Sequence, residues 1–504
     1  MNHREEWGTR AGFIFAAVGS AIGLGNIWRF PAVAYDNGGG AFFLPYLFAL
    51  LTAGIPLLIL EFTMGHRYRG SAPLTFSRMS KGSEWIGWWQ VAISFVIATY
   101  YSVIIAWALS YTKFAISQAW GEDTAGFLIK DYLQAGEVGE IGNLVPGVLV
   151  PLIIVWVVIL GVLSAGVKKG IETANKIFIP LLVILFFVVV IRAITLDGAI
   201  EGLNQFFKPD WSTIFNGKVW VAAYGQIFFS LSIGFAIMVT YSSYLPKKSD
   251  ITNNAFITGF ANSSFELLAG IGVFSALGFM AMQQGVGLDE IVDGGVTLAF
   301  AVFPSIINEL PAFQTAFGVL FFLSLALAGI SSLLSIAETF IAGIQDKFQL
   351  NRVPAVLLGG GLSAIVSIIY ATNGGLFILD TVDYFINQFG VALAGLFEVI
   401  FVSWYLKQLK PLQSHANAVS DIRIGTWWRI CLSVITPIVL GYMMFDNLRQ
   451  NLLSEYEDYP RELIFNFGWS VAIGVMLLAT LMTMKKWNKD QIEIPSTFDK
   501  KEAQ

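Results

Sequence analysis

The stretch Gly19-Ser20-Ala21-Ile22-Gly23-Leu24-Gly25-Asn26 lies inside a hydrophobic segment that is long enough to cross a bilayer. Its glycines and polar side chains weaken a helix at a depth where water is scarce. A second hydrophobic segment carries a comparable interruption, Ser230-Leu231-Ser232-Ile233-Gly234-Phe235-Ala236. Irregular backbone inside a membrane is tolerated only where it is buried in protein or lines a cavity. Two interrupted helices, well separated along the chain, are typical of secondary transporters.

Composition supports a membrane protein. Of the 504 residues, 56% are hydrophobic and 13% are charged, whereas soluble domains carry about 25% charged residues. We expect an all-α integral membrane protein with twelve transmembrane helices. The expected spans cover residues 11–34, 41–64, 85–112, 145–167, 177–196, 219–245, 252–280, 311–340, 353–371, 376–406, 427–445 and 463–484.

Basic residues predict the orientation, because Lys and Arg gather in cytoplasmic loops. Both termini and one alternate set of connections hold 22 of the 30 basic residues, whereas the opposite set holds seven. We therefore expect a multi-pass protein of the cell membrane with cytoplasmic N- and C-termini.

Residue counts also exclude several classes of function. One cysteine and three histidines exclude a disulfide framework and a Cys/His metal cluster. The chain has no phosphate-binding Gly-Lys-Ser/Thr loop, which argues against ATP as an energy source. We expect no enzyme activity and no nucleic-acid partner; the expected partners are the lipid bilayer and a small-molecule substrate.

The first ten spans divide into two sets of five, each opening with an interrupted helix. An odd number of spans in each half inverts the second half relative to the first, which is the arrangement of inverted-repeat transporters. The expected units are a cytoplasmic segment 1–10, a first repeat 11–200, a second repeat 201–406, accessory helices 11 and 12 in 407–485, and a cytoplasmic tail 486–504.

Each break exposes amides at one half-helix end, which suit a carboxylate, and carbonyls at the other, which suit a cation. Oxygens of Asn26, Ser230 and Asn262 are candidate ligands for a first cation, and those of Ser331 and Ser332 for a second. A lone pair of serines is more often simply a close helix contact. The combination with two broken helices favours cation sites.

These residues resemble the neurotransmitter:sodium symporters, in their bacterial amino-acid branch with the LeuT fold. The resemblance runs from the N-terminus through about residue 406. The matching motifs are Trp7-Gly8-Thr9-Arg10, Gly23-Leu24-Gly25-Asn26-Ile27-Trp28-Arg29-Phe30-Pro31, Asn37-Gly38-Gly39-Gly40-Ala41-Phe42, Gly54-Ile55-Pro56 with Glu61, Tyr100-Tyr101, and Gln226-Ile227-Phe228-Phe229-Ser230-Leu231-Ser232.

The resemblance implies two sodium ions and residues that hold them. The first site would comprise Ala21, Asn26, Ser230, Asn262 and the substrate carboxylate. The second would comprise Gly19, Ile22, Ala328, Ser331 and Ser332.

It also implies a substrate pocket and two gates. The pocket would comprise Ser20, Ala21, Gly23, Gly25, Ile97, Tyr101, Phe229, Ser230, Ser232, Phe235, Ser332 and Ile336. The outer gate would pair Arg29 with Asp383, and the inner gate would pair Arg4 with Asp346, supported by Trp7 and Tyr244.

Three positions refine the implied function. At Gly23, the amine transporters of the family carry an aspartate, so glycine argues for a substrate that brings its own carboxylate. Glu266 matches a position that is serine, beside bound chloride, in animal members. A fixed carboxylate near Tyr46, Gln226 and Ser230 would replace that chloride and could carry a proton outward on the return step. Because Ser20 is often asparagine in relatives, their detailed substrate preferences do not carry over directly to this chain.

Ionisable groups inside spans are costly and often functional. We interpret Glu61 and Glu398 as interior carboxyls that hold helices together through a proton or a hydrogen bond. Glu338 is expected to line the hydrated exit path.

The predicted function is sodium-coupled import of a neutral, hydrophobic L-amino acid, without chloride. An ion channel is disfavoured, because selectivity filters are usually formed by symmetric rings of subunits. A non-transporting amino-acid sensor of the same fold stays open, as do the exact amino acid, the sodium stoichiometry and the oligomeric state.

Overall fold

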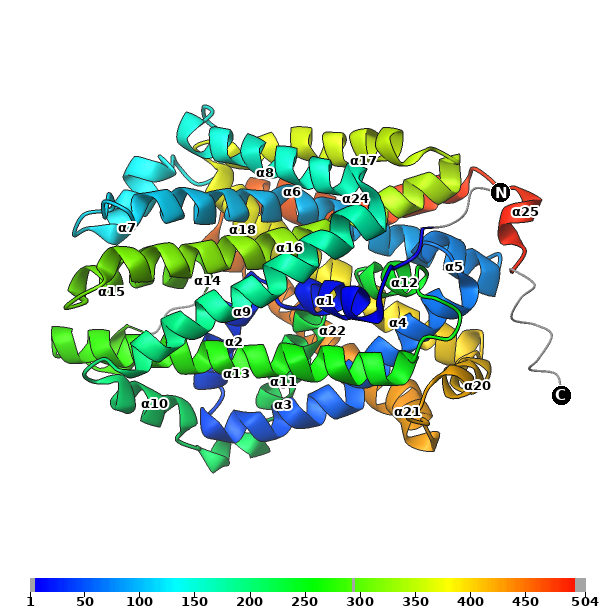
Figure 1. The fold of residues 1–504 in the computed structure, drawn as a ribbon, viewed down its shortest axis with the longest axis horizontal. Coiled ribbons are helices and arrows are strands. Elements are labelled where there is room, and N and C mark those ends of the chain that lie inside the picture. The colour runs from blue at the N-terminus through cyan, green and yellow to red at the C-terminus, as the bar shows by residue number, and fades with distance from the viewer. Residues whose placement is uncertain (1–4, 292–294, 495–504) are drawn as a thin grey trace.

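The computed structural model describes residues 5–291 and 295–494, and this part of the chain is helical, with no β-strand beyond two isolated bridges. The long helices lie side by side along the long axis of the molecule, with the short helices α1 and α12 between them (Figure 1). The α-helices of six or more residues are α1 (Arg10–Ala21), α2 (Leu24–Asp36), α3 (Phe43–Ala49), α4 (Ile55–Tyr68), α5 (Ala72–Met79), α6 (Glu84–Phe114), α8 (Pro146–Ser164), α9 (Thr173–Ile194), α10 (Ala199–Phe207), α11 (Gly217–Ser230), α12 (Ile237–Ser242), α13 (Ile251–Gln284), α15 (Phe303–Glu309), α16 (Gln314–Phe348), α17 (Arg352–Ser367), α18 (Gly375–Phe385), α19 (Ala392–Ile400), α20 (Leu409–Val419), α22 (Thr436–Leu453) and α24 (Ser470–Thr483).

Ten continuous helices in the described residues are long and apolar enough to cross a membrane, and the bent pair α1 and α2 makes an eleventh candidate. The ten are Gly40–Tyr68, Glu84–Phe114, Pro146–Ser164, Val167–Ile194, Ile251–Gln284, Gln314–Phe348, Arg352–Ala371, Gly375–Tyr405, Thr426–Asp458 and Arg461–Thr483. The expected span 219–245 is divided between α11 and α12, each too short to qualify alone. The twelfth span therefore remains a prediction.

The first break separates α1 from α2 by a bend of 52°. Thr9 caps α1 by accepting a hydrogen bond from the amide of Gly12 at 3.0 Å. The helix ends at Ala21 because Ile22 and Gly23 are extended. The Asn26 side chain then accepts a hydrogen bond from the Gly23 amide at 2.8 Å and starts α2.

The second break separates α11 from α12 and contains three left-handed residues, Ser232, Gly234 and Ala236. This conformation costs a non-glycine residue about 1–3 kcal/mol, so surrounding contacts must hold it. The Glu61 carboxylate accepts a hydrogen bond from the Gly234 amide at 2.8 Å, and the Ser94 hydroxyl donates one to the Phe235 carbonyl at 2.6 Å. Neighbouring helices therefore stabilise the break.

Helix α16 is the element on which much of the core is assembled. It packs on α6, α9, α17 and α1. It continues to Phe348, beyond the expected end at residue 340, and Lys347 in its last turn is buried. Asp346 and Lys347 therefore belong to the helix itself rather than to a connection.

Candidate functional site

The polar residues expected to hold the first cation converge at the two breaks. The Asn26 Nδ2 atom lies 2.8 Å from Asn262 Oδ1 and 3.4 Å from Ser230 Oγ, and Asn262 Nδ2 lies 2.6 Å from Ser230 Oγ. All three residues are buried, as is Ala21, the last residue of α1. The carbonyls in the last turn of a helix lack partners within it. The cluster therefore combines side-chain oxygens with a helix end.

The five residues expected at the second cation site also meet. The Ser331 hydroxyl lies 3.0 Å from the Gly19 carbonyl and 2.9 Å from the Ala328 carbonyl. The Ser332 hydroxyl lies 3.2 Å from the carbonyls of both Gly19 and Ile22. Oxygen atoms from α1 and α16 thus converge at the end of α1, a ligand set that suits a hard cation.

Gly23 lies between these two clusters, and its neighbours leave little room for a side chain. A Cβ atom at this position would lie 3.0 Å from the Tyr101 hydroxyl and 3.3 Å from the Ser332 hydroxyl. The Tyr101 hydroxyl accepts a hydrogen bond from the Leu24 amide at 3.1 Å. At Gly25, by contrast, a Cβ atom would meet only ordinary contact with Arg29, at 3.9 Å. The close approach of Tyr101 therefore favours glycine at 23.

The remaining pocket residues lie on the same helix faces as these polar groups. Ile97 lies one turn from Tyr101 on α6, and Ile336 lies one turn from Ser332 on α16, so each pair shares a face. Phe235 is buried in the second break. Ser232 donates a hydrogen bond to the Ser20 carbonyl at 3.0 Å, which joins the two breaks directly. The structure thus places Ile97 and Ile336 on the helix faces that carry Tyr101 and Ser332.

The expected outer gate pair, Arg29 and Asp383, belongs with Phe229 and Asn387 to a group that we call the Arg29 cluster. The Arg29 guanidinium lies over the Phe229 ring, 4.7 Å from its centre. Asp383 accepts a hydrogen bond from Asn387 at 2.8 Å. Arg29 and Asp383 attract each other electrostatically, but among the described residues their charged atoms do not approach within 4 Å.

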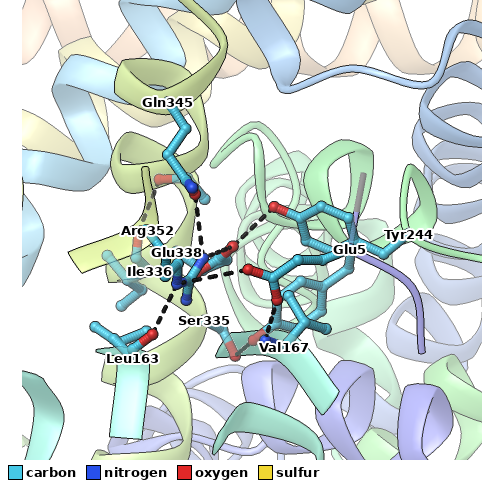
Figure 2. A network of polar contacts seen from close by, with 11 residues as sticks. Glu5, Leu163, Val167, Tyr244, Ser335, Ile336, Glu338, Gln345 and Arg352 are labelled. Atoms are coloured by element: carbon cyan, nitrogen blue, oxygen red, sulfur yellow. Dashed lines mark hydrogen bonds and ion pairs between the residues drawn. The ribbon is translucent and has the colours of Figure 1, made fainter. Parts of the chain in front are cut away.

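A dense polar group, the Glu338 network, lies on the other side of the breaks. Figure 2 shows Glu5, Tyr244, Glu338 and Arg352 of this network, and Trp7 and Tyr241 complete it. The Glu338 carboxylate is fully buried. It accepts hydrogen bonds from the two terminal nitrogens of Arg352 at 2.8 and 2.6 Å and from the Tyr244 hydroxyl at 2.7 Å. Our expectation of a hydrated Glu338 is wrong for this structure, because Arg352 neutralises its charge in the interior.

The residues expected to support the inner gate belong to or adjoin this network. The Trp7 indole donates a hydrogen bond to the Tyr241 carbonyl at 2.8 Å, and the Trp7 amide donates one to the Tyr244 carbonyl at 3.1 Å. Asp346 accepts a hydrogen bond from the Ser71 amide at 2.8 Å. Arg4, its expected partner, lies outside the described residues.

The segment after the last span covers the same end of the bundle, where α5 and the short helix α25 (Lys489–Ile492) lie (Figure 1). Gln491 donates a hydrogen bond to the Asp346 carbonyl at 2.6 Å. The ammonium group of Lys347 lies 4.3 Å from the Trp487 ring centre and forms a buried ion pair with Glu84. The chain after α24 thus contacts the helix turn that carries Asp346.

The other interior carboxyls are all hydrogen-bonded. Glu266 is fully buried and accepts hydrogen bonds from the Tyr46 hydroxyl and, at 2.7 Å, from the Gln226 side chain. Glu398 accepts a hydrogen bond from Gln90 at 2.5 Å. Glu61 fastens the second break, as described above. Glu266 also hydrogen-bonds the Ser230 side chain, so its carboxyl group lies next to the first cation cluster.

A buried histidine pair joins α4, α20 and the chain after α12. His66 Nδ1 lies 2.9 Å from His415 Nε2, and His66 Nε2 lies 3.0 Å from the Pro246 carbonyl. Burial of His415, together with the positive charges of Arg67 and Arg69, lowers its pKa from 6.5 to about 4. His415 is therefore neutral at pH 7.

Comparison with known proteins decides the family. The family model described as "Sodium:neurotransmitter symporter family" matches residues 4–128 and 122–490. This chain belongs to that family. It is 43% identical to an uncharacterised sodium-dependent transporter of Methanocaldococcus jannaschii over 96% of this chain and 99% of the relative. It is 28% identical to the sodium-dependent dopamine transporter of Bos taurus, over 96% of this chain and 75% of the relative.

A solved structure supports the same assignment. The crystal structure of MhsT in complex with L-phenylalanine matches with a TM-score of 0.74 and 33% identity, covering 88% of this chain and 99% of that one. The chain is thus a multi-pass membrane protein of a sodium-dependent symporter family with a LeuT-fold neighbour.

Sequence reasoning missed several residues that organise the site. Along the sequence Arg352 counts only as a charge in a connection, although in the fold it pairs with Glu338. Ser94, one of many serines in the spans, gave no signal that it holds Phe235. An arginine shortly after a span that contains a carboxylate would have been a usable signal, because buried charges need partners.

Proposed function

We propose that this protein couples inward movement of Na⁺ to the import of a neutral, hydrophobic L-amino acid. The observation that carries this proposal is the environment of Gly23. The hydroxyls of Tyr101 and Ser332 lie where a side chain would extend. Because the protein offers no carboxylate at this point, the substrate must bring its own.

The substrate's α-carboxylate would bind near the start of α2 and the Tyr101 hydroxyl, because helix N-termini attract anions. Its side chain would lie against the apolar groups of Ile97, Phe229, Phe235 and Ile336. The match to MhsT, solved with L-phenylalanine, supports an amino acid of this kind.

Two sodium ions would bind at the two oxygen clusters. The first cluster adjoins the proposed carboxylate position, so ion and substrate would stabilise each other electrostatically. One charge moving across 100 mV is worth about 2.3 kcal/mol. Two ions would supply roughly 4–5 kcal/mol, enough for on the order of a thousandfold accumulation.

Transport would not require chloride. Glu266, held by Tyr46 and Gln226, would supply a negative charge beside the first cation cluster when it is ionised. Loss of sodium would leave that charge uncompensated, and a proton taken up by Glu266 would neutralise it on the return step. This exchange would carry the proton outward.

The proposed topology has twelve spans, with both termini cytoplasmic. Residues 11–200 and 201–406 would form two inverted five-helix repeats, each opening with a broken helix, and 407–485 would hold two accessory helices. Alternating access would open the Arg29 cluster to the outside and the Glu338 network to the cytoplasm in turn.

The test is uptake of a labelled amino-acid panel into proteoliposomes, with external Na⁺ or K⁺ and with chloride or gluconate. We expect sodium-driven accumulation of apolar amino acids that survives removal of chloride. Sodium-dependent binding without accumulation would indicate a sensor of the same fold. Binding of no amino acid in the panel would contradict the proposed pocket.

A further inference from the structure

Helix α9 presents an unexpected polar side chain to the end of α1. Asn175 is fully buried, and its amide group donates a hydrogen bond to the Ile171 carbonyl of its own helix at 2.9 Å. Its Oδ1 atom accepts no hydrogen bond from any described residue. A buried acceptor without a partner is unusual in a native protein, and such atoms often serve a ligand or an ion.

The unpartnered oxygen of Asn175 is directed at Gly19. A Cβ atom on Gly19 would lie 2.6 Å from Asn175 Oδ1. The carbonyl of the same glycine receives the hydroxyls of Ser331 and Ser332, at 3.0 and 3.2 Å. The second cation cluster and Asn175 Oδ1 therefore both border Gly19.

Asn175 also lies on the face of α9 that meets α1. Glu172, one turn before Asn175, presents its carboxylate to the start of α1, where it accepts hydrogen bonds from the Gly8 amide at 2.6 Å and the Thr9 hydroxyl at 2.8 Å. Residues three apart on a helix share a face. Helices α1, α9 and α16 pack on one another, so Asn175 lies at their junction.

We propose that Asn175 Oδ1 is an oxygen ligand for the second sodium ion as that ion leaves its site toward the cytoplasm. The inference rests on the proposed function and extends it to a residue outside the expected sodium sites. As the ion moves away from the Ser331 and Ser332 hydroxyls, Asn175 offers the next oxygen. The Glu172 carboxylate one turn away is already paired with Lys176 at 2.6 Å. Because Oδ1 has no competing donor among the described residues, it accepts the ion without breaking a hydrogen bond.

The test compares the sodium dependence of uptake on the two sides of membrane vesicles that hold the transporter in one orientation. Asn175→Ala removes the oxygen. We expect the internal sodium concentration that halves the initial uptake rate to rise roughly fivefold, whereas the external concentration for half-maximal uptake changes less than about twofold. Asn175→Asp, which keeps the size and adds charge, should lower the internal value.

Ser363→Ala is the matched control, because Ser363 is a fully buried hydroxyl without a hydrogen-bond partner among the described residues, on α17. It should leave both values unchanged. An unchanged internal value in Asn175→Ala, or equal shifts on both sides, would overturn the inference. If Asn175→Ala does not fold, an unchanged internal value in Asn175→Asp would do the same. Absence of sodium-driven uptake in the unmodified protein would instead refute the proposed function.

Discussion

The Glu338 network and the Arg29 cluster lie on opposite sides of the helix breaks, and they are closed in different ways. In the Glu338 network, direct contacts of 2.6 to 3.1 Å join the N-terminal segment, the end of α12, α16 and α17. In the Arg29 cluster, the two opposite charges attract each other without forming an ion pair, and the guanidinium instead lies over an aromatic ring.

The two ends therefore contribute differently to the conformational equilibrium between the outward-open and inward-open states. Direct buried contacts cost several kcal/mol to break, whereas the attraction between two separated charges varies only gradually with the distance between them. The structure therefore corresponds to a state whose cytoplasmic end, in the proposed orientation, is firmly shut. Substitutions in the Glu338 network should shift the equilibrium more than substitutions in the Arg29 cluster.

The largest effect is expected for Glu338→Ala. This change leaves Arg352 without its carboxylate, and removing one partner of a buried ion pair costs about 3–5 kcal/mol. The cytoplasmic end should open. A cysteine at Ser335, placed in a Cys431→Ala background, should react much faster with a thiol reagent.

Glu309→Ala is the control for that experiment, because Glu309 is exposed at the end of α15. It should leave the reactivity at Ser335 unchanged. Slow labelling in Glu338→Ala would show that the buried ion pair does not hold this end closed.

A somewhat smaller effect is expected for Trp7→Ala. Trp7 is 4% exposed and packs edge-on against Phe13, Tyr241 and Tyr244. Truncation of a buried tryptophan costs about 3–5 kcal/mol, but unlike Glu338→Ala it leaves no uncompensated buried charge. The same cysteine assay should report opening, whereas Trp211→Ala, at a tryptophan that is 55% exposed, should not. Equal reactivity in the two variants would contradict the importance of this contact.

Acidification should lower the free energy of unfolding by protonating the buried histidine pair. The pKa of His415 is lowered in the folded protein to about 4, so its neutral form is preferred. Below pH 6.5 the unfolded chain binds a proton at His415 that the folded protein does not bind. The free energy of unfolding is therefore at its full value above pH 6.5 and falls as the pH approaches 4, by about 3 kcal/mol at most. Thermal unfolding measured across this range should show the loss, and His415→Gln should reduce it. An identical pH profile in that variant would exclude His415 as the cause.

The smallest effect is expected for Arg29→Lys. Lysine keeps the charge but loses the planar contact with Phe229, which is worth about 1 kcal/mol. Substrate affinity should fall roughly fivefold, and the reactivity at Ser335 should not change. Arg449→Lys, at an exposed arginine, is the control. If Arg29→Lys increased the reactivity of the cysteine at position 335 more than Glu338→Ala does, the Arg29 cluster would be the end that holds the conformation.

The two breaks could be predicted from the sequence because glycines and polar residues, grouped inside an apolar segment, weaken the helix at that point. The sequence also indicated that Asn26, Ser230 and Asn262 lie together, and the structure brings them within hydrogen-bonding distance. The proximity of these side chains could be predicted because local composition and the family motifs both point to them, whereas their role as sodium ligands stays a prediction.

Other features could not be read from local patterns. The extension of α16 to Phe348 depends on partners for Asp346 and Lys347 that come from distant segments. The pairing of Glu338 with Arg352 depends on how the chain folds back after α16. The position of the Asn175 oxygen beside Gly19 becomes visible only once α1 is packed on α9.

Sodium-dependent binding of a labelled apolar amino acid should be measured on the purified unmodified protein and on Asn26→Ala. This comparison shows whether the first cation cluster holds sodium. Asn26 starts α2 and contacts both other side chains of the first cation cluster. We predict that Asn26→Ala needs at least about tenfold more sodium for half-maximal binding, as expected from the loss of a direct oxygen ligand. An unchanged sodium dependence would contradict the assignment of this cluster as a sodium site.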